Sequence, residues 1–545
     1  MRNRSGFTLF AAGLLLLAGA AGAQEPQQIR VDSTAPPVEA TGVEVRDGAV
    51  LLTLDEAVEI ALRQNLGLSI QRYTRNRARL AVGRELGIYD LRASSLLHAE
   101  DAKTPSGSQL EGSQTNIQRF NFGFDQLFPT GGNLNLGWTN SRREDDNPFL
   151  TVNPSFRSGL TFALNQPLLR DFGRLATERN LLVARNRSEA SREEFERQLV
   201  VSVQDVIDAY WNLVGARQQL IVAEESMKLA RELHDRNRIQ VEVGTMAPLE
   251  LVQSEAAIAE REEGIITAQS AVGDAEDALR RLLNLPEGEL WATEIRPATD
   301  PTIQHTPIDV AAAIQTALAE RPELRFQQLD IEQARIETEF ARNQERPTLD
   351  LDVSYGFAGL GGDVLVEDPV TGEIRRVPGG FGDAFSNVTG LDFPGWVAEL
   401  TFGFPLQNRG ARAARAIADI DLQRAQSAME DARNAIVTEV RGAARRVETA
   451  AKQIEAAKAS RTFQERNLDA ERKRYENGMS TSFQITQIQE DLTQAKSREV
   501  NSIVNYRIAL AEYQRATGRL LEEEGVSIDD EEAQIERWQF SLRGR

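Results

Sequence analysis

The chain is 545 residues long, with 62 Lys+Arg against 82 Asp+Glu, a formal net charge of -20 and an aromatic content of only 6%. This acidic balance argues against nucleic acid as a partner. Because the chain has no cysteine and only three scattered histidines, it lacks the side chains for disulfides, thiolate metal sites and cysteine nucleophiles. We therefore expect no metal, no cofactor and no enzymatic activity.

The first 23 residues have the pattern of a signal peptide. Two arginines precede an apolar run from Phe7 to Ala20, and three small residues then favour cleavage after Ala23. A permanent anchor helix is the alternative, but the run is short for a bilayer. Position 24 is Gln24 rather than cysteine, so we expect an exported protein without a lipid anchor. Residues 24–48 predict a flexible leader.

The rest of the chain follows one plan twice. Residues 54–79 resemble residues 310–335, with alanines, leucines, a glutamine and an arginine at matching positions. Each half continues with an alternating stretch that ends in a proline, Pro167 or Pro405, and then with a long helical segment. This internal duplication predicts two structural repeats. We expect them at residues 49–295 and 308–521, joined by a linker at 296–307 and followed by an acidic tail at 522–545.

Two long helical hairpins are predicted from a seven-residue apolar repeat, which is typical of coiled coils. The helical segments run from about residue 175 to 243 and from about 411 to 477, each roughly 100 Å long at the rise of an α-helix. The first ladder is Leu199, Val206, Leu213, Leu220, Met227, His234 and Val241, where we interpret His234 as a packing residue; the second is Val440, Val447, Ile454, Arg461, Leu468 and Tyr475. Gly244 and Gly478 end these helices, and a second helix returns from each, although Glu499 interrupts the second returning ladder.

Strands are predicted between the helices because polar and apolar residues alternate there. The clearest alternation runs through residues 119–142, with a turn at 129–132, and further strands are expected at 349–355 and 396–404. In an exported protein these strands suit a transmembrane β-barrel, with a soluble sandwich as the alternative. We interpret the glycine-rich region 359–395 as a long exterior loop.

The chain resembles the TolC-type outer membrane efflux proteins from about Leu52 to Leu521. The resemblance rests on the duplicated plan, on the Gln-Pro-Leu and Phe-Pro-Leu junctions at Pro167 and Pro405, and on the two glycine tips. It implies an α+β membrane protein: a homotrimer that jointly builds a transmembrane β-barrel in outer membrane lipid and a long periplasmic α-helical barrel. The implied function is the exit duct of a tripartite efflux or type I secretion system, reached through a periplasmic adaptor and an inner membrane pump of the RND or ABC type.

Family practice is four strands per protomer, which we expect near residues 89–101, 156–166, 349–357 and 396–404. The hairpin at 119–142 is additional, and either enlarges the barrel or folds against it. A single chain has too few strands to close a transmembrane barrel, which independently favours an oligomer.

The resemblance also assigns site residues near the tips. Adaptor-contacting residues are expected at Val243, Gly244, Thr245, Leu251, Asn477, Gly478, Met479 and Ile485. For the periplasmic gate, Tyr475 matches the family tyrosine and Glu250 an acidic partner. The match then departs, because Ser480 stands at the arginine position and Gln484 and Gln487 stand where two aspartate rings are expected. Glu490 and Asp491, one turn along, are either a substitute ring or a solvated face.

Two classes of function compete. The first is a passive export duct, and the second is a structural coiled-coil envelope protein without transport activity. The duplicated plan with alternating strands favours the duct. No catalytic constellation stands out among the charged residues, so an enzyme is the least favoured class.

Overall fold

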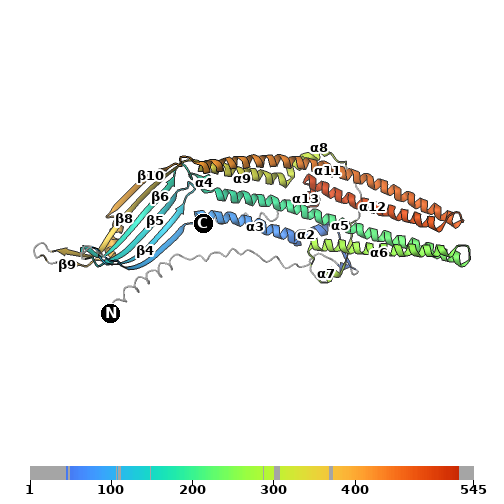
Figure 1. The fold of residues 1–545 in the computed structure, drawn as a ribbon, viewed down its shortest axis with the longest axis horizontal. Coiled ribbons are helices and arrows are strands. Elements are labelled where there is room, and N and C mark those ends of the chain that lie inside the picture. The colour runs from blue at the N-terminus through green and yellow to red at the C-terminus, as the bar shows by residue number, and fades with distance from the viewer. Residues whose placement is uncertain are drawn as a thin grey trace.

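The computed structural model describes residues 45–526 except 47–48, 106, 108–111, 148, 286–287, 300–306, 368–371 and 373. The predicted signal peptide, almost all of the leader, part of the linker and most of the acidic tail lie outside the described residues. A β-sheet stands at one end of an elongated molecule and two helix tips at the other (Figure 1).

Each half has a pair of helices before its main-sheet strands, then a long helix and a shorter returning helix. In the first half the helices are α2 (Leu54–Gln64), α3 (Leu66–Leu86), α4 (Arg174–Thr177), α5 (Arg179–Glu242), α6 (Pro248–Leu283) and the short α7 (Glu289–Ala292). In the second half they are α8 (Val310–Glu320), α9 (Pro322–Gln344), α10 (Phe381–Thr389), α11 (Arg409–Glu476), α12 (Ser482–Thr517) and α13 (Leu520–Glu523). The short helices differ in place, since α4 follows the strands of the first half and α10 lies between the last two strands of the second. No helix in the described part of the chain is both long and apolar enough to cross a membrane.

The predicted long helices are confirmed as α5 and α11. They contain 64 and 68 residues, which corresponds to about 96 and 102 Å at 1.5 Å per residue. Ladder residues are buried along both, and Val206, Leu213 and Val440 are completely inaccessible. The two charged residues that interrupt the second hairpin's ladders meet each other, since Arg461 Nε lies 2.5 Å from the Glu499 carboxylate.

Both predicted tips are sharp turns at glycine. Gly244 has φ +75° and Gly478 has φ +70°, a left-handed conformation that glycine adopts at little cost. Pro248 occupies the first turn of α6, where its missing N–H is not needed. The side chain of Thr481 caps α12 by accepting a hydrogen bond from the Gln484 amide at 3.3 Å.

The main sheet is antiparallel, with the strand order β10-β8-β6-β5-β4-β3. The strands are β3 (Arg92–Lys103), β4 (Gln114–Leu127), β5 (Asn133–Asp145), β6 (Val152–Pro167), β8 (Thr348–Glu367) and β10 (Pro394–Gly403). The predicted additional hairpin is β4–β5, and it lies inside the sheet rather than against it. Tyr89, expected at the start of the first strand, instead ends the short 3-10 helix η1 (Gly87–Tyr89).

The prediction of a long exterior loop at 359–395 is wrong. Strand β8 continues to Glu367, β9 (Ile374–Val377) pairs back on it, and α10 packs on β8 and β6. The glycines mark close approach rather than a loop, because a Cβ on Gly359 would lie 1.9 Å from the Ala384 carbonyl oxygen and one on Gly361 2.3 Å from the Gly380 carbonyl oxygen. Only a residue without a side chain lets α10 lie so near the strand.

A small second sheet braces the middle of the long helices. It comprises β1 (Val45–Arg46), β2 (Ala49–Leu52) and β7 (Glu294–Pro297), with β2 and β7 parallel, so residues 296–297 belong to a strand and not to a linker. Tyr210 of α5 is completely buried beside it; its hydroxyl donates to the Leu52 carbonyl at 3.0 Å and accepts from the Thr299 amide at 3.0 Å. The largest apolar cluster of the described residues surrounds this point.

Candidate functional site

The two helix tips carry exposed apolar side chains. Among the predicted contact residues, Val243 and Met479 are 68% and 62% exposed, whereas Ile485 is 2% exposed and packs against Tyr475 and Leu233. The remaining members of the predicted set are exposed, apart from the half-exposed Leu251. Sequence reasoning missed three further exposed apolar residues at the tips, which are Leu249, Val252 and Phe483. They lie outside the seven-residue ladders, and an apolar residue off the ladder next to a tip is the signal that identifies them.

A buried polar network ties the two hairpins together just above the tips. The Tyr475 hydroxyl of α11 donates to Asn237 Oδ1 of α5 at 2.6 Å, and Asn237 Nδ2 donates to Ser482 Oγ of α12 at 2.7 Å. Asn237 is 0% exposed, so these bonds form away from water. Gln240 Oε1 lies 3.3 Å from the same tyrosine hydroxyl. Asn237 was not among the predicted residues. It stands three residues after the ladder residue His234, and this spacing places it in the second core position of the same heptad.

Burial raises the pKa of Tyr475, and the negative charge of Glu250 raises it further. The hydroxyl therefore stays protonated and remains a hydrogen-bond donor at neutral pH. Glu250 itself, expected as the direct partner of this tyrosine, acts on it through charge, while the hydrogen bonds go to the amide side chains of Asn237 and Gln240.

Charged side chains extend the contact between hairpins on either side of this network. Arg236 of α5 pairs with Glu476 of α11 at 3.2 Å, and farther from the tips Lys496 of α12 pairs with Glu225 of α5 at 2.6 Å. All of these pairs join the first hairpin to the second, so a relative shift of the hairpins would have to break them.

The predicted gate residues of α12 fall into two groups. Gln484 and Gln487 are exposed and, with Asp491, follow the spacing of three and four residues that places side chains on one helix face. Glu490 points elsewhere, because its carboxylate pairs with Arg261 of α6. Ser480, which stands at the expected arginine position, donates to Glu471 Oε1 at 2.5 Å and so lies within the second hairpin.

The sheet has one apolar and one polar face. Cross-strand neighbours share a face, and one apolar row joins Phe124, Leu136, Phe162, Tyr355 and Trp396 across five strands. The row on the other side consists of Arg92, Asp125, Asn135, Ala163 and Ser354, of which all but Ala163 are polar or charged. Asn135 Nδ2 donates to Asp125 Oδ1 at 2.8 Å within this row. A sheet of this kind suits a boundary at which the apolar face meets an apolar medium and the polar face meets water.

The two predicted junction prolines stand where strands give way to helices. Pro167 is the last residue of β6, paired with Asp350 of β8, and Pro405 follows β10, four residues before α11 begins. At the first junction, Tyr89 donates to Glu178 Oε1 at 3.0 Å. Burial and this carboxylate raise the pKa of Tyr89 to about 12, so the bond persists over the ordinary pH range.

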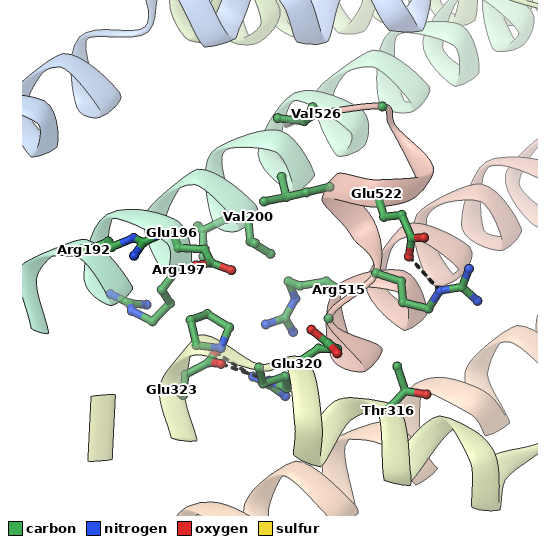
Figure 2. A pocket seen from close by; sticks show the side chains of 17 residues that line it. Arg192, Glu196, Arg197, Val200, Thr316, Glu320, Glu323, Arg515, Glu522 and Val526 are labelled. Carbon is green, nitrogen blue, oxygen red and sulfur yellow. Dashed lines mark hydrogen bonds and ion pairs between the residues drawn. The ribbon is translucent and has the colours of Figure 1, made fainter. Parts of the chain in front are cut away.

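A cleft of about 810 Å³ lies farther along the helices, between α5, the α8–α9 corner and the end of α12 (Figure 2). Both arginine and glutamate side chains line this cleft. Arg321 pairs with Glu323 at 2.8 Å, and Arg519 pairs with Glu522 at 3.4 Å. Burial and the charge of Glu193 raise the pKa of Glu196 on its wall. This pattern is typical of a solvated seam between helices.

A family model described as outer membrane efflux protein matches residues 129–285 and 313–519. The chain belongs to the outer membrane efflux protein family. Its members are channels and not enzymes, so the protein is an outer membrane efflux channel. Strands β3 and β4 precede the matched residues, so this part of the sheet is assigned by the structure alone.

Solved outer membrane channels share the fold. CmeC of Campylobacter jejuni is 16% identical, with a TM-score of 0.62 over 87% of this chain and 90% of that chain. VceC of Vibrio cholerae is 13% identical, with a TM-score of 0.61 over 85% and 96%. MtrE of Neisseria gonorrhoeae, solved in an open state, is 17% identical, with a TM-score of 0.60 over 86% and 89%. No curated protein sequence matches the chain.

Proposed function

We propose that three copies of this chain form the exit duct of a tripartite efflux or type I secretion system. The observation that carries the proposal is the joining of two helical hairpins, each about 100 Å long, to a sheet with one apolar and one polar face, in an efflux-family chain. The sheets of the three copies form a barrel in outer membrane lipid, and the hairpins form a helical barrel in the periplasm. Substrates pass through passively, driven by an inner membrane pump of the RND or ABC type.

The repeats we propose for this duct are residues 49–297, extended from the expected end at 295 to include the whole of β7, and residues 308–521. Their support is the repeated order of a helix pair, strands, a long helix and a shorter returning helix. A duplicated protomer gives each hairpin a pseudo-equivalent partner, so three copies offer six similar hairpins for one ring. Cleavage after Ala23 and an unmodified N-terminus at Gln24 remain part of the proposal, and mass spectrometry of the purified protein tests both.

The tips are the surface we propose for the periplasmic adaptor. Exposed Val243 and Met479 support this role, as do the neighbouring Leu249, Val252 and Phe483, because apolar side chains this exposed are favourable when a partner covers them. Ile485 is left out of the proposed contact set, since it is already buried within the protomer.

The narrowest point of the proposed duct lies just above the tips, lined by the exposed face of α12. Three neutral amides at Gln484 attract cations less than three carboxylates would in a narrow pore where charges are poorly screened. The double change Gln484→Asp plus Gln487→Asp is expected to increase cation preference and block by multivalent cations in bilayer recordings. Equal selectivity and block in parent and variant would put the constriction elsewhere.

Membrane extraction, native mass spectrometry and single-channel recording test the proposed function together. We expect detergent-extracted protein to run as a trimer before heating and to conduct ions in planar bilayers. A structural coiled-coil protein without transport activity would give no conductance. A monomeric protein that is soluble without detergent would refute both the trimer and the duct.

A further inference from the structure

The β4–β5 hairpin forms part of the sheet wall. Strand β3 pairs with β4 from Arg92 to Lys103, and β5 pairs with β6 without interruption from Asn133 to Arg143. The hairpin therefore separates β3 from β6 by two full strands. It also joins the helical end of the molecule, where the Gly173 amide donates to the Thr130 carbonyl in the β4–β5 turn at 3.0 Å.

Both faces of the sheet continue through this hairpin without a change of character. On the apolar side, Phe122 of β4 and Trp138 of β5 stack, and the same row continues to Leu160 and Phe357. On the other side, the hairpin supplies polar residues at the positions facing those of β3 and β6. A hairpin folded away from a barrel has no reason to keep both rows in phase with its neighbours, because a one-residue shift would exchange the two faces.

The two outer edges of the sheet, β3 and β10, are exposed along nearly their whole lengths. The edge strands have 12 and 10 residues, so their lengths are similar. Within a bilayer an open edge would leave a row of backbone N–H and C=O groups without partners, which is strongly unfavourable. Another strand has to cover each edge.

A second copy of this chain fits these edges. The path from β3 to β10 has six strands of alternating direction, so β3 and β10 run in opposite senses. When copies are related by rotation about a barrel axis, β3 of one copy meets β10 of the next in antiparallel orientation, and the ring closes without a reversed strand. The pleat also limits the register, because each face of β3 must continue into the same face of β10. Ser95 and Leu400 lie on the apolar face of the sheet, and Ser94 and Thr401 lie on the polar face.

The geometry points to an 18-stranded barrel, formed when β3 of each of three copies pairs with β10 of the next. This inference deepens the proposed function, because it takes the trimer from there. Barrel diameter grows roughly linearly with strand number, so this outlet is about 1.5 times as wide as one built from four strands per copy, with about twice the cross-section. The hairpin β4–β5 is what supplies the difference.

Cysteine pairs along one polar row test whether the hairpin is in the wall. The natural chain has no cysteine, so every cross-link reports the introduced pair. Arg92→Cys with Asp125→Cys joins β3 to β4, and Asn135→Cys with Ala163→Cys joins β5 to β6; both are direct neighbours and are expected to form disulfides on mild oxidation. Arg92→Cys with Ala163→Cys spans three strand spacings, about 14 Å, and is expected to stay unlinked. Linking of that last pair, without the first two, would show that β3 contacts β6 and would overturn the inference.

A second set of variants tests closure between copies. Ser94→Cys on β3 is combined with Val397→Cys, Glu399→Cys or Thr401→Cys on β10, which scan the registers that the pleat allows. One of the three combinations is expected to give covalent dimers and trimers on denaturing gels, while Ser94→Cys alone gives monomers only. A conducting trimer in which no combination links would overturn the edge pairing and leave the exit duct intact. Loss of the trimer and of conductance in the unmodified protein would instead refute the proposed function.

Discussion

Replacing Tyr475 by phenylalanine is expected to open the proposed constriction. The change removes the hydroxyl that donates to Asn237 Oδ1 across the two hairpins at 2.6 Å, and leaves that oxygen at a site with 0% exposure. A buried acceptor that loses its partner costs about 1 to 3 kcal/mol. In a symmetric trimer the loss occurs three times, so the arrangement seen here is destabilised by about 3 to 9 kcal/mol relative to one in which the hairpins have separated.

That range includes the free energy that shifts a two-state equilibrium from 1:99 to 99:1, about 5.5 kcal/mol. We therefore expect Tyr475→Phe channels in planar bilayers to spend a much larger fraction of time in a high-conductance state than the parent. Tyr506→Phe is the matched control, because it alters a buried tyrosine of the same α11–α12 hairpin about 36 Å from the tip end of α12, at 1.5 Å per residue. Equal open fractions for Tyr475→Phe and the parent, with the trimer intact, would refute the role of this bond in holding the hairpins together.

Three further predictions concern the helical part of the molecule. Glu499→Leu is expected to lower stability by about 1 to 2 kcal/mol, because Arg461 loses the carboxylate beside its Nε in a partly buried seam and keeps only Glu465, at 2.9 Å, as a partner. Arg461→Leu plus Glu499→Leu is expected to return close to the parent, and thermal unfolding followed by circular dichroism distinguishes this from two independent losses. Burial raises the pKa of Asp208 to about 6, with nearby carboxylates adding to the shift. Since the folded state binds this proton more tightly, the group lowers stability as pH rises through about 6, and Asp208→Asn should raise the melting temperature at pH 7.5 and leave it nearly unchanged at pH 4. Tryptophan at Gly244 and Gly478 strains two backbone positions with φ +75° and +70°, but a Cβ there meets no atom within 4 Å. Because the strain is confined to the exposed turns, the double variant should leave the trimer in the membrane but abolish export; normal export would remove the tips from the mechanism.

The helices were predictable because their signal is local and repeated many times. Seven-residue spacing over about ten to twelve turns leaves little ambiguity. Helices α5 and α11 end at Glu242 and Glu476, one residue before the predicted ends at 243 and 477. The glycines at the tips carried a second local signal. Side-chain partners across hairpins were harder to predict, because Asn237 and Tyr475 are 238 residues apart in sequence.

The sheet shows where sequence reasoning reaches its limit. Alternation identified β4 and β5 correctly, but strand order is a long-range property, and nothing in the alternation says whether β3 pairs with β4 or with β6. Glycine in the 359–395 region was ambiguous for a different reason. The same residue serves flexible loops and close packing, and only the position of α10 over Gly359 and Gly361 distinguishes the two.

The distribution of buried apolar residues explains why the tip end is the part suited to movement. Around Tyr210 and Trp211, packing joins α2, α5, α6, α12 and the small sheet in the largest cluster of the described residues. The cluster nearest the tips has far fewer members, which include Leu233, Tyr475 and Ile485. Hydrophobic stabilisation scales with the apolar area buried, so the hairpins are held firmly in the middle and weakly at their ends. The hydrogen bonds of Asn237 then supply directional contacts where apolar contacts are fewest. Exchanging such a hydrogen bond for another one costs less free energy than opening a packed core. Local opening near the tips is therefore compatible with a rigid middle, and a partner that binds the exposed tip side chains acts on the part of each hairpin that costs least to move.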